Sequence, residues 1–219
     1  MQIKMPKART RYIRPNIDLS SMLDIPSLIQ YMERAPRTVR YPNIPQAPES
    51  ELLYLTSALS IEVRELMDTL EEVNYGDPQI TNKVVVNDID VALEEVGDIL
   101  WYSALILRYI GLDHTTPEDD LRRCLGGIDV SVCSISMSDA TLLTALPQAT
   151  ANIQEIAVKA FRDMHLLEDK TEYVEKLNDL LRHGVIVTLA WCKSLADSVD
   201  VELSDVCDYN TEKLQERGA

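Results

Sequence analysis

Glycine, phenylalanine and long apolar runs are scarce in this chain of 219 residues, which contains seven glycines and one phenylalanine. Stretches in which β-branched and polar residues alternate are also few, so the composition favours helices over strands. No apolar run reaches the roughly 18 residues that a membrane-spanning helix needs. The basic start lacks the apolar segment of a secretory signal. We therefore expect a cytoplasmic protein with no membrane partner.

Cysteine is used sparingly, and its spacing excludes a simple zinc site. Cys124, Cys133, Cys192 and Cys207 form no C-x-x-C pair and have no histidine at zinc-ligand spacing. We interpret them as core thiols in a reducing compartment. Positive charge is also scarce, because 21 basic residues against 36 acidic ones give a net charge of −15. This charge argues against duplex nucleic acid as the main partner, and a polyphosphate substrate would need bridging metal ions.

The basic residues that do occur are concentrated at the N-terminus. Residues 1–14 hold five lysines and arginines and no acidic residue, and seven of the ten prolines lie before residue 49. We therefore predict an irregular basic arm over residues 1–48, with one short helix near Ile25–Arg34, followed by an all-α domain over residues 49–219. The arm can pack on the acidic body of the same chain or on a neighbouring subunit.

Helical periodicity begins at the end of this arm. Asn74 to Pro78 predicts a stop and a loop, residues 79–87 a linker, and Gly111 the end of the second long helix. Residues 111–149 are less regular, with short helices expected near 117–125 and 138–146 and breaks at Pro117 and Pro147. The predicted long helices cover about residues 50–73, 88–110, 149–163, 171–197 and 202–217.

Two acidic motifs lie on the first two long helices. Glu62 and Glu65 form E-x-x-E, and Glu95 and Asp98 form E-x-x-D. A spacing of three places both side chains of a pair on the same side of a helix. If the two helices face each other, four carboxylates meet, and they stay ionised together only around a cation. All-oxygen ligation favours Mg²⁺, for which Mn²⁺ can substitute.

Solvated acidic faces are the alternative interpretation, because acid pairs at this spacing are common among 36 acidic residues. The neighbours of these acids argue against it. Glu62 lies in line with apolar residues such as Leu66, and Glu95 and Asp98 lie in line with Tyr102. Burial of acids is unfavourable unless they are paired or bound to metal. The pattern therefore favours a metal site over a solvated face.

Two further motifs accompany the acidic pairs along the chain. The chain reads EVRELMDTL over 62–70, NYG over 74–76, LEEVGDILWY over 93–102 and NTEKLQER over 210–217. These motifs, in this order, resemble the MazG-like all-α nucleoside triphosphate pyrophosphohydrolases. The resemblance implies a helical bundle in which the motif helices are antiparallel. Compared with minimal members, the chain carries an insertion at about 111–170 and the additional N-terminal arm.

The resemblance implies roles for the acids. Glu62, Glu65, Glu95 and Asp98 would be the metal ligands and catalytic residues, and one of them, or Glu94, would act as the base. A solvated acid beside a ligand is the alternative reading of Glu94.

Substrate-binding candidates lie on the last helix and near the motif helices. Lys213 and Arg217 are four residues apart, so both can reach polyphosphate oxygens, although cations near a helix C-terminus are common. Asn210 lies one turn earlier and can bind substrate or cap locally. Lys83 lies in the predicted linker, where a surface lysine is the alternative. The aromatic candidates for the nucleotide base, for which core packing or a surface position is the alternative, are Tyr75, Trp101 and Tyr102.

The implied activity is Mg²⁺-dependent hydrolysis of a (deoxy)nucleoside triphosphate to the monophosphate and pyrophosphate, by a dimer or a dimer of dimers. The overall form is closest to bacteriophage-type members, which implies the host cytoplasm and a preference for dGTP or GTP. A di-iron carboxylate bundle is disfavoured, because no histidine follows a glutamate by three residues. A non-catalytic helical adaptor that binds nucleotides or proteins is the remaining alternative.

Overall fold

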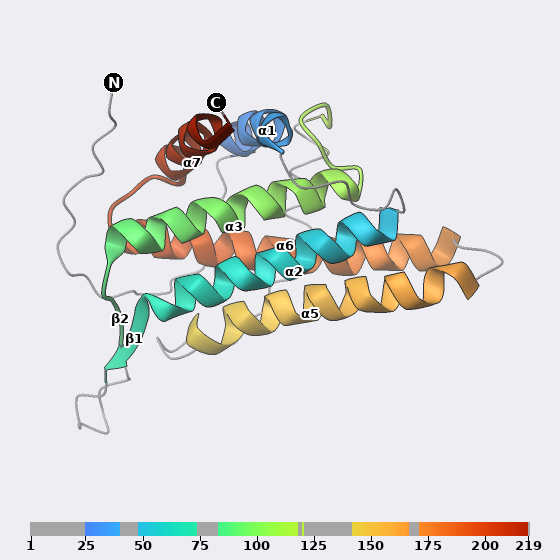
Figure 1. Ribbon diagram of the computed structural model, residues 1–219, viewed down its shortest axis with the longest axis horizontal. Coiled ribbons are helices and arrows are strands. Elements are labelled where there is room, and N and C mark those ends of the chain that lie inside the picture. Colours follow the sequence, from blue (N-terminus) through green and yellow to red (C-terminus); the bar gives the residue numbers. More distant parts are fainter. Residues whose placement is uncertain are drawn as a thin grey trace.

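The protein is described by a computed structural model that covers residues 25–39, 48–73, 83–117, 120, 142–166 and 171–218. The described chain is predominantly helical, as predicted (Figure 1). α2 packs on α3 and α5, and α6 packs on α3 and α5, so four long helices form a bundle. α1 and α7 lie beside each other on α3. The helices are α1 (Ile25–Arg34), α2 (Pro48–Asp68), α3 (Ile89–Tyr109), α5 (Leu142–Asp163), α6 (Thr171–Ser198) and α7 (Leu203–Gly218), with short 3-10 turns η1 (Ala35–Thr38) and η4 (Met164–Leu166).

A β-hairpin joins the end of α2 to the start of α3. Its strands, β1 (Leu70–Val73) and β2 (Lys83–Val86), pair antiparallel. The prediction of a helix continuing to Val73 was therefore wrong, as was that of a linker over its described part, 83–87. The predicted loop from Asn74 to Pro78 and residues 79–82 lie outside the described residues. α2 ends because both the N–H and the hydroxyl of Thr69 bond the carbonyl of Leu66, at 3.0 and 2.7 Å. The valines of β2 suit a strand, and the hairpin brings the end of α2 and the start of α3 to the same end of the bundle (Figure 1).

The other helix boundaries follow local sequence closely. Asp88 caps α3, since its side chain accepts a hydrogen bond from the N–H of Val91 at 3.2 Å. Gly111 has φ +83° just after α3, a conformation that favours glycine. α5 differs from the prediction: it begins at Leu142, and Pro147 lies inside it rather than breaking it. Pro147 is the sixth residue of α5, where a proline removes one backbone hydrogen bond and its ring crowds the preceding turn, so the packing of α5 on α2 and α6 must offset this cost.

Residues 25–39, which belong to the predicted N-terminal arm, pack on the body of the same chain. Tyr31 and Met32 are each 1% exposed. The indole N–H of Trp101 on α3 bonds the carbonyl of Ala35 at 3.1 Å and the hydroxyl of Thr38 at 2.9 Å. These contacts make α1 and η1 part of the hydrophobic core.

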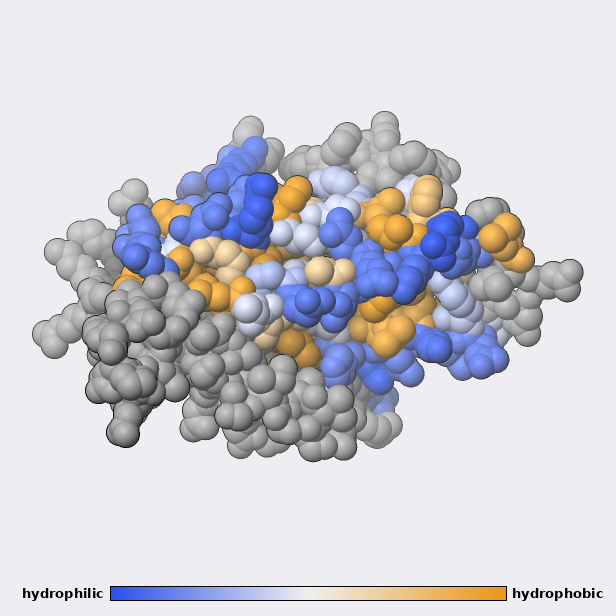
Figure 2. Space-filling view, turned by 90° about the horizontal axis from the view of Figure 1, so that it is seen from below, coloured by the Kyte–Doolittle hydropathy of each residue, from blue (hydrophilic) through white to orange (hydrophobic). Residues whose placement is uncertain are grey.

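The surface of the bundle is mixed in character. Figure 2 shows hydrophobic residues interspersed with hydrophilic ones on the face seen from below in Figure 1. Among the described residues, no helix combines the length and the apolar character that a membrane crossing requires. Cys192 and Cys207 are buried thiols, as predicted, and burial raises the pKa of Cys207 to about 12. Cys124 and Cys133 lie outside the described residues.

Candidate metal centre

Three of the four predicted ligands converge between α2 and α3. Glu62, Glu95 and Asp98 each place a carboxylate oxygen within 4.8 Å of the other two. All three side chains are half-buried. Oxygen ligands around Mg²⁺ lie about 3–4 Å apart, so this arrangement suits a small divalent cation. No other group of three His, Cys, Asp or Glu side chains converges in this way in the part of the chain that the structure describes.

The pKa values of the cluster show how closely its charges interact. Burial raises the pKa of Glu62 to about 7, helped by repulsion from Asp98, Glu65 and Glu95 in that order. Burial, Asp98 and Glu65 also raise the pKa of Glu95, whereas the Lys213 ammonium opposes that rise. Glu65 is exposed, yet its charge acts on both neighbours. A bound cation would offset repulsion that the protein alone does not neutralise.

Metal-free protein is expected to lose stability as the pH rises between about 4.5 and 7. In this window folded Glu62 keeps a proton that the unfolded chain, titrating near 4.5, has released, so stability falls with rising pH. After a discount for the half-exposed carboxyl, the effect is about 1–2 kcal/mol. Urea unfolding with EDTA at about pH 5 and pH 8 measures it. E62Q should reduce the difference by this amount, and exposed E172Q should not; equal pH dependence in wild type and E62Q would contradict the assignment.

Two predicted residues of α7 bond Asp98 directly. The Asn210 side-chain amide donates to one oxygen of Asp98 at 2.6 Å, and the Lys213 ammonium lies 2.7 Å from the other. Asn210 is fully buried, and the Lys213 side chain is only 10% exposed. Lys213 thus supplies a cation at the cluster. Arg217, the third predicted residue of this helix, is exposed near the end of α7.

Tyr31 on α1 belongs to the same network, and the sequence analysis did not identify it. Its hydroxyl lies 2.8 Å from the carboxamide oxygen of Asn210, to which it donates, and 3.3 Å from the carbonyl of Gly97. Burial raises the pKa of Tyr31 well above its usual range, so the hydroxyl keeps its proton. Apolar spacing on α1 could have indicated that Tyr31 is buried, but not that it meets a residue of α7.

Gly97 allows α7 to approach α3 at this point. A Cβ atom built on Gly97 would lie 2.9 Å from Cβ of Asn210 and 3.0 Å from its amide nitrogen. Real Cβ atoms essentially never come within 3.0 Å, so any larger residue would displace the Asn210 side chain or α7. The glycine of the E-E-V-G-D motif is therefore needed for packing, one residue before Asp98.

Gly97→Ala is expected to impair metal binding more than folding. The overlap with Asn210 is offset in part by the gain of about 1 kcal/mol in helix propensity, so the net loss of stability should be about 1–2 kcal/mol. Gly184→Ala is the matched control, because a Cβ there would press on Ile153 between α5 and α6, away from Asp98. Thermal unfolding with and without Mn²⁺ separates the effects. G97A should lose most of the Mn²⁺-induced shift and G184A should keep it; equal shifts would contradict this role of Gly97.

The remaining candidates receive different placements. Trp101 packs in the core, and its ring meets that of Tyr102 edge to face, with centroids 4.8 Å apart. Tyr102 is half-buried; burial raises its pKa, as do Tyr54 and Glu62, so it lies near the cluster. Glu94 accepts a hydrogen bond from the Tyr209 hydroxyl at 2.7 Å, which favours a structural role for it.

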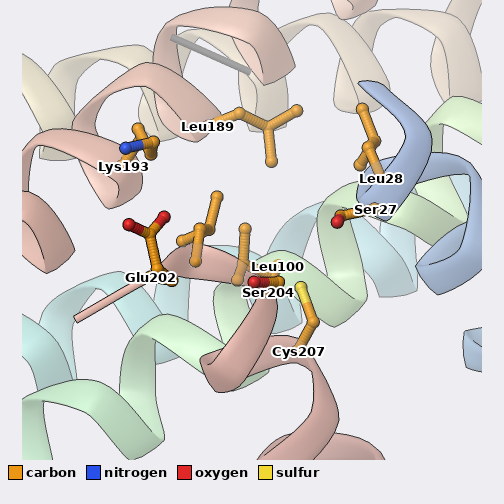
Figure 3. A pocket seen from close by; sticks show the side chains of 9 residues that line it. Ser27, Leu28, Leu100, Leu189, Lys193, Glu202, Ser204 and Cys207 are labelled. Carbon is orange, nitrogen blue, oxygen red and sulfur yellow. The ribbon is translucent and has the colours of Figure 1, made fainter. Parts of the chain in front are cut away.

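Lys83, Tyr75 and one hollow of the bundle supply no described group to the cluster of Glu62, Glu95 and Asp98. Lys83 begins β2, but its side chain, like all of Tyr75, lies outside the description. A largely apolar hollow between α1, α3, α6 and α7 is lined by Leu28, Leu100 and Lys193, among others (Figure 3). None of the predicted site residues lines it.

The arrangement combines two kinds of group. Oxygen ligands from α2 and α3 suit a hard cation, and the Lys213 ammonium beside them suits an anionic oxygen.

The chain was compared with protein-family models, with curated proteins and with solved structures, and no match was found in any of the three.

Proposed function

We propose that this protein is a Mg²⁺-dependent nucleoside triphosphate pyrophosphohydrolase that releases a monophosphate and pyrophosphate, with dGTP or GTP as the preferred substrate. The observation that carries the proposal is the convergence of Glu62, Glu95 and Asp98 beside Lys213. Phosphoanhydride cleavage depends mainly on neutralising charge and on positioning water and phosphate. Antiparallel packing of α2 and α3, as in the MazG-like enzymes, would provide this combination.

We assign the roles of the site residues from their positions. Glu62, Glu95 and Asp98 would hold the Mg²⁺ ion, and the exposed Glu65 would be the fourth ligand that the resemblance implies. Mn²⁺ could replace Mg²⁺. Bound Mg²⁺ neutralises phosphate charge and lowers the pKa of a coordinated water. Lys213 would bind a polyphosphate oxygen, and one cluster carboxylate would accept the proton of the attacking water.

The composition of the cluster supports this proposal over a di-iron enzyme and over a protein-binding adaptor. Di-iron carboxylate bundles place histidine among their carboxylates, and the described cluster contains acids alone. An adaptor that binds only proteins would leave unexplained the three half-buried acids held together against their repulsion. An adaptor that binds nucleotides could use the same acids, and turnover separates it from an enzyme. Lys83, Arg217 and Tyr102 remain proposed substrate contacts. Asn210 is fully buried and bonded to Asp98, so we propose that it supports that carboxylate and does not contact the substrate.

Product analysis tests the reaction. The protein is incubated with each canonical (d)NTP and Mg²⁺, and monophosphate, pyrophosphate and orthophosphate are separated and quantified. Monophosphate with an equal amount of pyrophosphate supports the proposal and ranks the bases. Orthophosphate alone, once contaminating pyrophosphatase is excluded, would indicate another phosphohydrolase. The absence of turnover together with the absence of Mg²⁺-dependent stabilisation would favour the adaptor.

Self-association as a dimer or a dimer of dimers is a further expectation from the resemblance. Within one chain, α2 and α3 already pack on α5 and α6. Light scattering coupled to size-exclusion chromatography measures the mass in solution, and a mass of one chain, 24.7 kDa, would contradict the expectation.

A further inference from the structure

We infer that Tyr31 is a positioning residue for the metal centre, acting through Asn210 on Asp98; this inference rests on the proposed function. The three side chains come from different helices and form one chain of hydrogen bonds. Tyr31 on α1 donates to the carboxamide oxygen of Asn210 on α7, at 2.8 Å. The carboxamide nitrogen of Asn210 donates to Asp98 on α3, at 2.6 Å.

Asp98 and the Tyr31 hydroxyl together fix which way the Asn210 carboxamide faces. An asparagine side chain carries an oxygen acceptor and an NH₂ donor at nearly equivalent positions, so its orientation depends on its partners. The Asp98 carboxylate accepts hydrogen bonds, so the NH₂ group must face it. The oxygen then faces α1, where Tyr31 supplies the donor. Both ends of the fully buried carboxamide are thus satisfied in one orientation.

Loss of the hydroxyl would loosen this arrangement. The carboxamide oxygen of Asn210 would be left buried without its donor, which is unfavourable enough to drive the side chain to another rotamer. Asp98 would then be held only by Lys213, at 2.7 Å. An ion site that depends on Asp98 would become less well ordered, since partners behind metal ligands commonly set metal affinity.

Tyr31 lies in the segment 25–39, outside the stretch of sequence that resembles the pyrophosphohydrolases. It is 1% exposed, and its helix packs on α3 and α7. Through this contact, a segment that contributes no metal ligand would control the geometry of the metal centre.

The test is a Mn²⁺ titration followed by electron paramagnetic resonance of the free ion, which requires no enzyme activity. Y31F removes the hydroxyl alone and should weaken Mn²⁺ binding about 10-fold. T38V is the matched control, because it removes a buried hydroxyl from the same segment, one that contacts Trp101 instead of Asn210. T38V should lose comparable thermal stability and keep wild-type Mn²⁺ affinity.

A double-mutant cycle with N210A shows whether Tyr31 acts through Asn210. N210A alone should weaken Mn²⁺ binding at least as much as Y31F, and adding Y31F should change the affinity no further. If Y31F proves unstable, all variants are titrated with added sucrose, which stabilises the folded state. Equal Mn²⁺ affinity in wild type, Y31F and N210A would overturn the inference while leaving the metal site intact. If wild type binds Mn²⁺ no better than E95Q/D98N, the metal site and this inference both fail.

Discussion

The E95Q/D98N variant is expected to lose about 1000-fold or more in kcat/KM for Mg²⁺-dependent hydrolysis of its best nucleoside triphosphate. Both carboxylates belong to the group that lies within 4.8 Å, and the amides carry no charge with which to hold a divalent ion. Metal ions commonly contribute several kcal/mol to phosphoryl chemistry, and about 4 kcal/mol corresponds to this loss. Initial rates of pyrophosphate release at saturating and limiting Mg²⁺ measure it.

The folded state should survive this double substitution. Amides of nearly the same size remove repulsion around Glu62, and this offsets in part the loss of the Lys213–Asp98 ion pair, so metal-free E95Q/D98N should stay folded with a modestly lower unfolding temperature. The chain offers a matched control, because Glu172 and Glu175 on α6 form a second E-x-x-E pair whose side chains are both exposed. E172Q/E175Q should keep full activity and full stabilisation by Mg²⁺. Equal activities in the two double variants would show that the cluster is not the site.

Lys213→Met is expected to reduce kcat/KM by about 100-fold. Methionine keeps the length and apolar stem of lysine but removes the ammonium that would bind a polyphosphate oxygen. A hydrogen bond to a charged group contributes about 1.5–3 kcal/mol, which corresponds to roughly 10- to 150-fold. Steady-state kinetics with the preferred nucleotide measure the loss. K213R, which keeps the charge in a different shape, should fall between K213M and wild type.

K213M should also change the stability of the metal-free protein. Lys213 is the cation bonded to Asp98, so K213M leaves that carboxylate less well compensated and should lower the unfolding temperature without Mg²⁺. Added Mg²⁺ should recover much of this loss, since the ion replaces the missing positive charge. Lys176→Met, which removes an exposed lysine on α6, is the control and should change neither measurement. Full activity in K213M would exclude Lys213 from phosphate binding.

Several helices could be predicted because their determinants are local. An aspartate at the start and a glycine after the end bound α3, and apolar spacing identified α6 and α7 to within a few residues. The hairpin could not be found in this way. Leu70–Val73 continues the spacing of α2, and only pairing with Lys83–Val86 makes it a strand. The backbone groups of a strand are satisfied by a partner that lies elsewhere in the chain.

The sequence by itself determined where the acidic pairs lie on their helices. Helical spacing of three places Glu95 and Asp98 on one side of α3, whatever the rest of the chain does. It also indicated that these acids and Glu62 lie at the edge of an apolar face, where acids need partners. Metal-site candidates follow from such short-range rules.

Only the tertiary structure decided which residues hold the acids in place. Asn210 is 112 residues from Asp98, and Tyr31 is 179 residues from Asn210, yet hydrogen bonds join them in one chain. The lack of a side chain at Gly97 matters only because α7 packs against α3 at that residue. No local pattern specifies such contacts, because they depend on how α1, α3 and α7 meet when the core closes. The sequence therefore determined which groups could bind a metal ion, and the packing of the helices decided which of them meet and which residues hold them in place.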